Sequence, residues 1–336
     1  MGSVRQRSFA CIRVGVSGWR YAPWRGVFYP KTLPQHSELW YLSRILSSVE
    51  INGSFYSLQR PEYYARWHDE TPDGFVFAVK GPRFITHMKR LRDVEAPLAN
   101  FFASGVFNLR GKLGPILWQF PPQLRYDRAK LADFLKLLPR DTAEALKIAR
   151  KRDYRLKGRA RLAIDSVRPV RHAIEVRHES FVDPDFIELL RRFNIALVIA
   201  ETADRWPMMH DITADFVYLR LHGDKKLYQS GYGDRALERW AERIKAWHEG
   251  KEPADARKVL NAKPPISRRR DVFCYFDNTD VKLRAPVDAQ SLMRKLGLQP
   301  GMPPRYERSK REAPLRAART SARSRSRGSS RIAANV

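Results

Sequence analysis

The stretch that decides the fold is Ala173-Ile174-Glu175-Val176-Arg177-His178, an apolar run in which charged residues recur at every second position. Such a run is typical of a β-strand, whose side chains alternate between two faces, so Glu175 and Arg177 are expected on the same side. Two other segments repeat the pattern and pair Arg220 with His222 and Glu50 with Asn52. Buried polar groups are costly unless paired, so several strands that end this way predict a site at their ends.

Strand-like and helix-like segments alternate along almost the whole chain. The predicted strands are Ile12–Ser17, Ser48–Asn52, Phe75–Lys80, Gly114–Phe120, His172–Arg177, Ala196–Ala200, Phe216–His222 and Val272–Asn278. The predicted helices include Ser37–Leu46, Pro61–Glu70, Val94–Leu109, Arg128–Leu138, Pro184–Phe193, Asp234–His248 and Val287–Leu296. Strands that alternate with helices predict an α/β fold with a parallel sheet, and eight strands are the number that closes a TIM-like (β/α)8 barrel. An open doubly wound sheet is the alternative, although no Gly-x-Gly-x-x-Gly motif follows the first strand.

The composition is that of a globular protein with a strong basic excess. The chain has 336 residues, of which 43% are hydrophobic, and a formal net charge of +27. It has no run of about 18 uncharged apolar residues, so we expect no membrane-spanning helix and no membrane partner. Arg13 and Gly15 interrupt the first apolar run, which argues against a signal peptide. Cys11 and Cys274 lie in strand-like runs and are expected to be buried, reduced thiols, which favours a cytoplasmic protein.

The basic residues are concentrated in two segments. We predict an N-terminal extension over residues 1–11, a single barrel domain over 12–297 and a tail over 298–336. Residues 147–171 and the tail each contain ten Lys or Arg and two acidic residues. Residues 147–168 are expected to form a basic surface insertion, as a loop or hairpin. The Arg/Ser-rich tail is expected to be disordered, because it cannot bury enough apolar surface, and to bind nucleic acid non-specifically at low salt.

Eight short motifs, taken in order, resemble one known family. They are Gly15–Trp19 with Tyr21, Val49–Tyr56, Phe75–Lys80, Ile85–His87, Gly114–Pro122, Ala173–His178, Val217–Gly223 and Tyr275–Asn278. Together they are similar to the YecE-like family, a domain of unknown function (DUF 72), from Arg13 to Leu296. The resemblance implies a TIM-like barrel and no particular reaction. The chain departs from the family pattern in its basic insertion, its basic tail and Asp277, where the family often has Asn.

Active sites of TIM barrels lie at the carboxyl ends of the strands. As catalytic residues we predict Glu175, Glu50 and His222. As substrate-binding residues we predict Arg177, Arg220, Lys80, Asn52, Gln119, Trp19, Tyr56, His87, Asp277 and Asn278. Carboxylates, cations and histidines gathered near one axis are typical of a site that shifts pKa values, although such charges also form purely structural networks.

Four chemistries are compatible with such a site. Glu50 and Glu175 would act as an acid–base pair on a glycoside if their separation matched that of a glycosidase. A metal is disfavoured, because no His-x-His or His-Glu-x-x-His motif is present and cations lie nearby, and no cofactor is indicated. Lys80 is expected to be salt-bridged to carboxylates rather than to act as a Schiff-base nucleophile. Anion binding is favoured, because Arg177 and Arg220 suit bidentate recognition of phosphate or carboxylate.

The sequence therefore predicts an acid–base enzyme, of hydrolase or isomerase type, that acts on a phosphorylated or otherwise anionic small molecule at the barrel mouth. One alternative is a nucleic-acid-binding protein or phosphodiesterase, in which Trp19, Tyr21 and Trp24 would stack on bases. Another is a non-catalytic ligand-binding barrel. The sequence indicates no oligomeric state.

Overall fold

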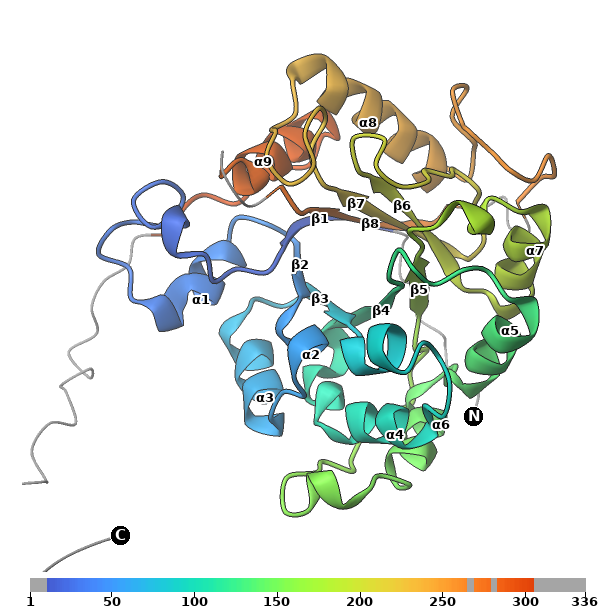
Figure 1. Cartoon of the computed structure of the whole chain (residues 1–336). Coiled ribbons are helices and arrows are strands. Elements are labelled where there is room, and N and C mark those ends of the chain that lie inside the picture. The colour runs from blue at the N-terminus through green and yellow to red at the C-terminus, as the bar shows by residue number, and fades with distance from the viewer. Residues whose placement is uncertain (1–10, 265–268, 279–282, 305–336) are drawn as a thin grey trace, which may run out of the picture. The chain divides into compact units, whose positions relative to one another are not determined.

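Eight parallel strands form a closed barrel in the computed structural model, which describes residues 11–264, 269–278 and 283–304. The strands are β1 (Ile12–Ser17), β2 (Ser48–Ile51), β3 (Val76–Lys80), β4 (Leu113–Gln119), β5 (His172–Glu175), β6 (Ala196–Glu201), β7 (Phe216–Leu221) and β8 (Asp271–Phe276). They pair in chain order, and β8 closes the ring by pairing with β1. Figure 1 shows this ring with helices outside it, which confirms the predicted TIM-like barrel.

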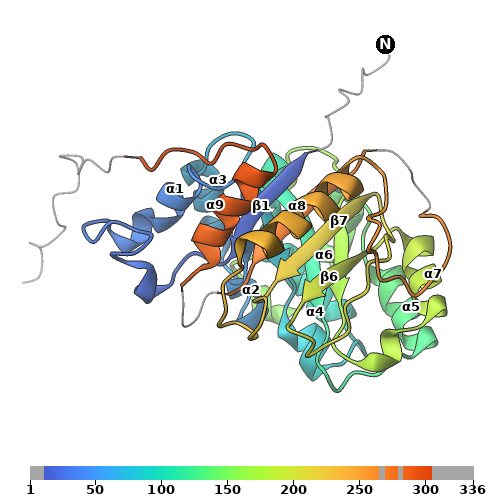
Figure 2. The same ribbon diagram turned by 90° about the horizontal axis from the view of Figure 1, so that it is seen from above.

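The helices lie outside the ring of strands. They are α1 (Glu38–Leu42), α2 (Gly53–Tyr56), α3 (Pro61–Glu70), α4 (Glu95–Ala103), α5 (Arg128–Leu137), α6 (Thr142–Ala149), α7 (Pro184–Phe193), α8 (Asp234–His248) and α9 (Ala285–Lys295). Helices α8 and α9 lie side by side, and α9 packs on β8 and β1 (Figure 2). The short helix α1 and the segment before it stand to one side of the ring (Figure 1).

The interior of the barrel alternates small and large side chains. Alanines on β3, β5 and β6 face aromatic residues on β7 and β8, and all are buried. The rings of Tyr218 and Tyr275 lie 5.2 Å apart, and the Tyr275 hydroxyl lies 2.8 Å from Ser48 Oγ. Filling of this kind makes the barrel a packed core, which leaves its carboxyl end as the place for a site.

Two predicted helices are shorter than expected, and two helices, α2 and α6, were not predicted. The predicted helix Val94–Leu109 ends at Ala103, because Gly105 has φ +101° and a Cβ there would lie 2.5 Å from Pro61 Cα. The predicted helix Ser37–Leu46 is α-helical only over Glu38–Leu42. Helix α6 was not predicted, although its N-cap Asp141 accepts a hydrogen bond from the Glu144 N–H (2.8 Å). Local capping of this kind starts a helix even where apolar periodicity is weak.

The basic insertion is not a hairpin. It begins inside α6 and continues as irregular chain with one 3₁₀ turn, Tyr154–Leu156. Arg161 N–H donates to Ala103 C=O (2.8 Å), which fixes this chain against the end of α4.

The ends of the predicted barrel domain differ slightly from expectation. The described chain continues past 297, and Gly301 N–H donates to Ile45 C=O (3.0 Å). Residues 1–10 of the predicted extension and 305–336 of the predicted tail lie outside the described residues. Cys274 is buried as expected, whereas Cys11 is exposed.

Candidate functional site

A buried arginine joins the carboxyl ends of the strands. Arg220 on β7 is 1% exposed and donates from Nε and Nη2 to the two oxygens of Glu50 on β2 (3.1 and 2.9 Å). Its Nη1 donates to Glu175 Oε2 on β5 (2.7 Å), and Nη2 also donates to Asp277 Oδ2 after β8 (2.9 Å). The Ser17 hydroxyl on β1 donates to Glu50 Oε1 (3.0 Å). All three guanidinium nitrogens are engaged by the protein, so the bidentate anion contact expected of Arg220 does not fit this structure.

The strand register makes room for these charges. The register partners of Glu50 are Ala78 on β3 and Ser17 on β1, both small. Arg220 has Ala200 beside it on β6 and Tyr275 on β8, so a small side chain stands on at least one side of each charge. Tyr218, two residues before Arg220 on the same face of β7, donates its hydroxyl to Glu50 Oε2 (2.7 Å). The layer of charges therefore rests directly on the aromatic core, and both carboxylate oxygens of Glu50 and of Glu175 accept hydrogen bonds, as burial requires.

Glu175 is shared by three donors. Its Oε1 accepts from Gln119 Nε2 (2.9 Å) and Arg177 Nε (2.8 Å), while Oε2 accepts from Arg220. Burial alone would raise the pKa of Glu175, but Arg220 and Arg177, with His222, hold that pKa well below its usual range. Glu175 is therefore a permanent anion, which suits it to positioning the two arginines and not to accepting a proton at neutral pH.

Asp277 and His222 form the last part of the network. His222 Nδ1 lies 3.0 Å from Asp277 Oδ2. Burial opposes ionisation of Asp277, yet Arg220 and the contact with His222 lower its pKa to about 2. Burial and the charge of Arg220 lower the pKa of His222, which favours a neutral ring, and Nδ1 is buried close to Asp277 without hydrogen-bond geometry. The His222 side chain is fully buried, which removes it from direct contact with a ligand.

Lys80, at the end of β3, has no ion-pair partner. In the described part of the chain, no carboxylate oxygen lies within 4.0 Å of its Nζ, which sits over the ring of Phe55 (4.3 Å from the centroid). Burial and, to a smaller extent, Arg220 lower the pKa of Lys80 to about 8, although nearby carboxylates raise it. The expectation of a salt-bridged Lys80 was wrong, because Arg220, Arg177 and His222 occupy the carboxylates.

An open cavity of about 960 Å³ lies above this network. It is lined by Tyr21, Asn52, Phe55, Tyr56, Lys80, Arg83, His87, Met88, Gln119, Arg177, Arg220, Tyr228 and Asp277. Eight predicted binding residues are thus brought together. The three predicted catalytic residues, Glu50, Glu175 and His222, lie below the cavity with no exposed surface.

Five lining residues were not among the predicted catalytic and binding residues: Tyr21, Phe55, Arg83, Met88 and Tyr228. Arg83 and Met88 lie in or beside the π-helical turn Phe84–Met88 that follows β3, and Arg83 stands 5.6 Å from the centroid of the Tyr56 ring. Tyr228, in the loop after β7, accepts a hydrogen bond from Arg177 Nη2 (3.2 Å). Tyr21 follows β1. Phe55 lies in α2, and all five residues follow the carboxyl end of a strand, which is the signal that would have found them.

Two predicted binding residues do not reach the cavity. Trp19 packs edge-on against Trp67, with ring centroids 5.2 Å apart, and is 7% exposed. Asn278 donates to Asp288 Oδ2 (2.9 Å) and to the C=O of Ser230 (3.1 Å), so it fastens the loop after β7 to α9. Both residues are structural.

The comparisons with known proteins agree with this architecture. The sequence model of a family described as "Protein of unknown function DUF72" matches residues 13–313. The chain belongs to the DUF72 family. It is 28% identical over 110 residues to UPF0759 protein YecE of Escherichia coli and 30% identical over 116 residues to UPF0759 protein YunF of Bacillus subtilis. These matches cover 33% of this chain and only 38% and 40% of those relatives.

Solved DUF72 structures share the fold. A DUF72 family protein from Thermotoga maritima matches with a TM-score of 0.63 and 21% identity, over 85% of this chain and 99% of that one. One from Enterococcus faecalis matches with a TM-score of 0.62 and 17% identity, over 88% of this chain and 100% of the other. At these identities the likeness concerns the fold alone.

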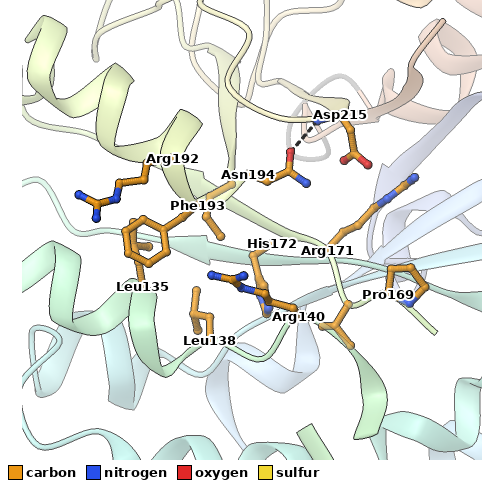
Figure 3. A pocket seen from close by; sticks show the side chains of 12 residues that line it. Leu135, Leu138, Arg140, Pro169, Arg171, His172, Arg192, Phe193, Asn194 and Asp215 are labelled. Carbon is orange, nitrogen blue, oxygen red and sulfur yellow. Dashed lines mark hydrogen bonds between the residues drawn. The ribbon is translucent and has the colours of Figure 1, made fainter. Parts of the chain in front are cut away.

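A second cavity of about 310 Å³ lies at the opposite end of this DUF72 barrel, by the amino ends of β5, β6 and β7 (Figure 3). Arg140, Arg171 and Arg192 line it, and Asn194 Oδ1 there accepts a hydrogen bond from the Asp215 N–H (3.0 Å). None of the predicted site residues belongs to it. Its exposed arginines, such as Arg192, can be substituted as controls for substitutions of the cations in the cavity at the carboxyl end of the barrel.

Neither a metal-binding cluster nor a membrane-spanning helix occurs in the described ranges. No three His, Cys, Asp or Glu side chains come together there in a way that would hold a metal ion. No helix of the described chain combines the length and the apolar character that crossing a bilayer requires.

Proposed function

We propose that the mouth of this DUF72 barrel binds an anionic small molecule and catalyses proton transfer on it. The observation that carries the proposal is the set of three cations around one open cavity. Lys80 and Arg83 have no carboxylate within ion-pair distance in the described chain, and Arg177 shares only Glu175. Cations that the protein leaves without counter-charges attract and orient an anion.

The side chains around these cations add neutral donors and acceptors. Asn52 and Gln119 line the cavity floor, and the hydroxyl of Tyr228 lies at the edge beside Arg177. Arg177 lies over the ring of Trp206, with its carbon Cζ 3.9 Å from the centroid, and its Nε donates to Glu175. A guanidinium fixed in this way loses little rotational freedom when it binds a phosphate or a carboxylate.

Groups that can exchange protons also reach the cavity. His87 Nδ1 lies 2.9 Å from Thr86 Oγ1, and its ring meets Phe55 edge-on at 5.1 Å. Burial, followed by the charges of Lys80 and Arg177, lowers the pKa of His87 to about 4, so the ring is a neutral base at pH 7. We assign proton transfer to His87 and Lys80, and give Glu50, Glu175 and His222 a positioning role through Arg220 and Arg177.

Calorimetric titration with inorganic phosphate and with phosphorylated sugars tests the proposal. Arg83 is exposed, so Arg83→Gln removes a charge without disturbing the fold. We expect it to weaken binding about tenfold, as for one charge-assisted hydrogen bond. Arg192→Gln, in the second cavity, is the matched control and should bind as the wild type does. Equal effects of the two substitutions, or no effect of either, would place anion binding outside the mouth.

A second candidate function is binding of single-stranded nucleic acid across the mouth. It is favoured by three exposed side chains, Tyr56, Phe84 and Met88, which line an adjacent cavity of about 310 Å³ with Arg83 and Arg155. Exposed rings beside cations suit base stacking. If this is the function, Tyr56→Ala weakens oligonucleotide binding across a salt series. If Tyr56→Ala leaves oligonucleotide binding unchanged, any affinity for nucleic acid comes from other basic segments of the chain. If the protein binds phosphate but converts none of the tested compounds, the result supports the third candidate function, a non-catalytic ligand-binding barrel.

A further inference from the structure

We infer that Lys80 is a nucleophile that forms an imine with an aldehyde or ketone group of the anionic ligand. The inference rests on the proposed function, because it concerns the same cavity, and it narrows the substrate class to anionic carbonyl compounds. It also gives Lys80 a covalent role, in addition to the electrostatic attraction of the anionic ligand.

Hydrogen bonds and close packing fix the backbone at Lys80 and Gly81. The Ser54 hydroxyl donates to Lys80 C=O (2.6 Å), and Gly81 N–H donates to Leu117 C=O on β4 (2.8 Å). A Cβ at Gly81 would lie 2.4 Å from the Trp118 ring, so only glycine fits there. These contacts fix the backbone from which the Lys80 side chain extends, and its amine lies over the Phe55 ring at the cavity.

The charges around Lys80 belong to other partners. Glu50 and Glu175 are bound by Arg220, Asp277 by Arg220 and His222, and Glu175 also by Arg177. The charge of Lys80 helps to lower the pKa of His87 to about 4, so His87 is neutral at pH 7 and offers Lys80 no counter-charge. A lysine used for structure would complete one of these ion pairs. Lys80 instead stands on an apolar ring beside a guanidinium, which is an environment that activates a lysine nucleophile.

The amine is neutral often enough to react. With a pKa of about 8, about one Lys80 in ten is uncharged at pH 7, compared with on the order of one in three thousand for an ordinary lysine. The exposed Lys151, for which no comparable enclosure exists, is a suitable internal reference.

The reaction balances with the ligand and water alone. The lone pair of neutral Nζ attacks the carbonyl carbon, the C–N bond forms and the C=O π bond breaks. The amine proton moves to the new oxygen by way of His87 or water. The carbinolamine oxygen then takes a second proton and leaves as water, and the C=N bond forms. No oxidant or reductant is consumed, and the positive iminium stands where the ammonium stood.

Reductive trapping tests the inference. Full-length protein would be incubated at pH 7 with glyoxylate, an anionic aldehyde, and sodium cyanoborohydride, and the labelled lysines would be quantified by peptide mapping. We expect labelling at Lys80 to be at least about tenfold faster than at Lys151. We also expect added phosphate to slow labelling at Lys80 only. Labelling at Lys80 that is no faster than at Lys151 overturns the inference.

The outcomes separate this inference from the proposed function. Lys80→Arg keeps a cation but cannot form an imine, so the adduct at position 80 should be lost, whereas Arg192→Gln in the second cavity should leave both Lys80 labelling and phosphate binding as in the wild type. If the wild type binds phosphate in an Arg83-dependent way but Lys80 is not preferentially labelled, the imine is wrong and the anion site stands. If Lys80→Arg does not fold, the ratio of Lys80 to Lys151 labelling in the wild type decides alone.

Discussion

Replacing Arg220 by methionine should destabilise the protein strongly, because one guanidinium serves three buried carboxylates. Removing one partner of a buried ion pair costs about 3–5 kcal/mol. An independent figure comes from Asp277, whose pKa falls from 3.8 to about 2 in the folded protein. At about 1.4 kcal/mol for each pKa unit, that shift alone corresponds to about 2 kcal/mol of stability at neutral pH. We therefore expect Arg220→Met to lower the free energy of unfolding by at least about 3 kcal/mol.

The loss should depend on pH in a defined direction. The folded pKa values of Glu175 and Asp277 are depressed, so their contribution is present above the unfolded values near 4 and is lost as pH falls through the folded values. Without Arg220 these buried carboxylates favour protonation, so the variant regains stability as the pH falls toward about 4. The gap between wild type and variant should be widest at pH 7.5 and narrower at pH 4.5. Urea unfolding followed by tryptophan fluorescence measures both gaps.

Arg243→Met is the control for this experiment. Arg243 pairs with Asp255, whose side chain is 53% exposed, so its loss should cost less than about 1 kcal/mol and vary little with pH. The reasoning would be refuted if Arg220→Met lost no more than Arg243→Met at pH 7.5. It would equally be refuted if the deficit of Arg220→Met were the same at both pH values.

Two further predictions concern the end of β3. Because the folded pKa of Lys80, about 8, lies below the unfolded value of 10.5, burial of the ammonium costs up to about 3 kcal/mol below pH 8, and this cost disappears as the pH rises toward 10.5. Lys80→Met should thus be more stable than the wild type at pH 7 by up to that amount, with a smaller difference in urea unfolding at pH 10. An equal or larger advantage at pH 10 would contradict the unpaired state of Lys80. Gly81→Ala would push a methyl group into the Trp118 ring and should lower stability by about 1–3 kcal/mol in thermal unfolding, whereas Gly111→Ala meets nothing within 4 Å and should be neutral. Equal thermal unfolding midpoints for the two variants would show that the Trp118 ring moves to accommodate the added methyl group.

The barrel itself was predictable because the pattern that specifies it is local. Each strand is a short apolar run, and each polar residue near its end can be assigned to a face by counting in twos. This counting correctly placed Glu50, Glu175 and Arg220 in one layer, although they are far apart in the chain.

The sequence did not predict which cation of that layer pairs with which carboxylate. Whether Lys80 or Arg220 takes the carboxylates depends on side-chain reach and on distances across the barrel, which periodicity does not contain. The sequence suggested catalytic carboxylates, but the structure buries Glu50 and Glu175 beneath the cavity. Arg83 and Tyr228 were missed because loops carry no periodic signal, and Asn278 was misplaced because its partner, Asp288, lies on the next helix.

The sharing of Arg220 has an evolutionary consequence. Its partners come from β2, β5 and the segment after β8, so a change at any one of them alters the electrostatic balance of the others. Substitutions among Arg220, Glu50, Glu175 and Asp277 should consequently be strongly non-additive. A lineage that loses Arg220, Glu50 or Glu175 would have to change the other two in concert, so these three positions should be inherited together, whereas position 277, where the family often has Asn, can exchange its carboxylate for an amide.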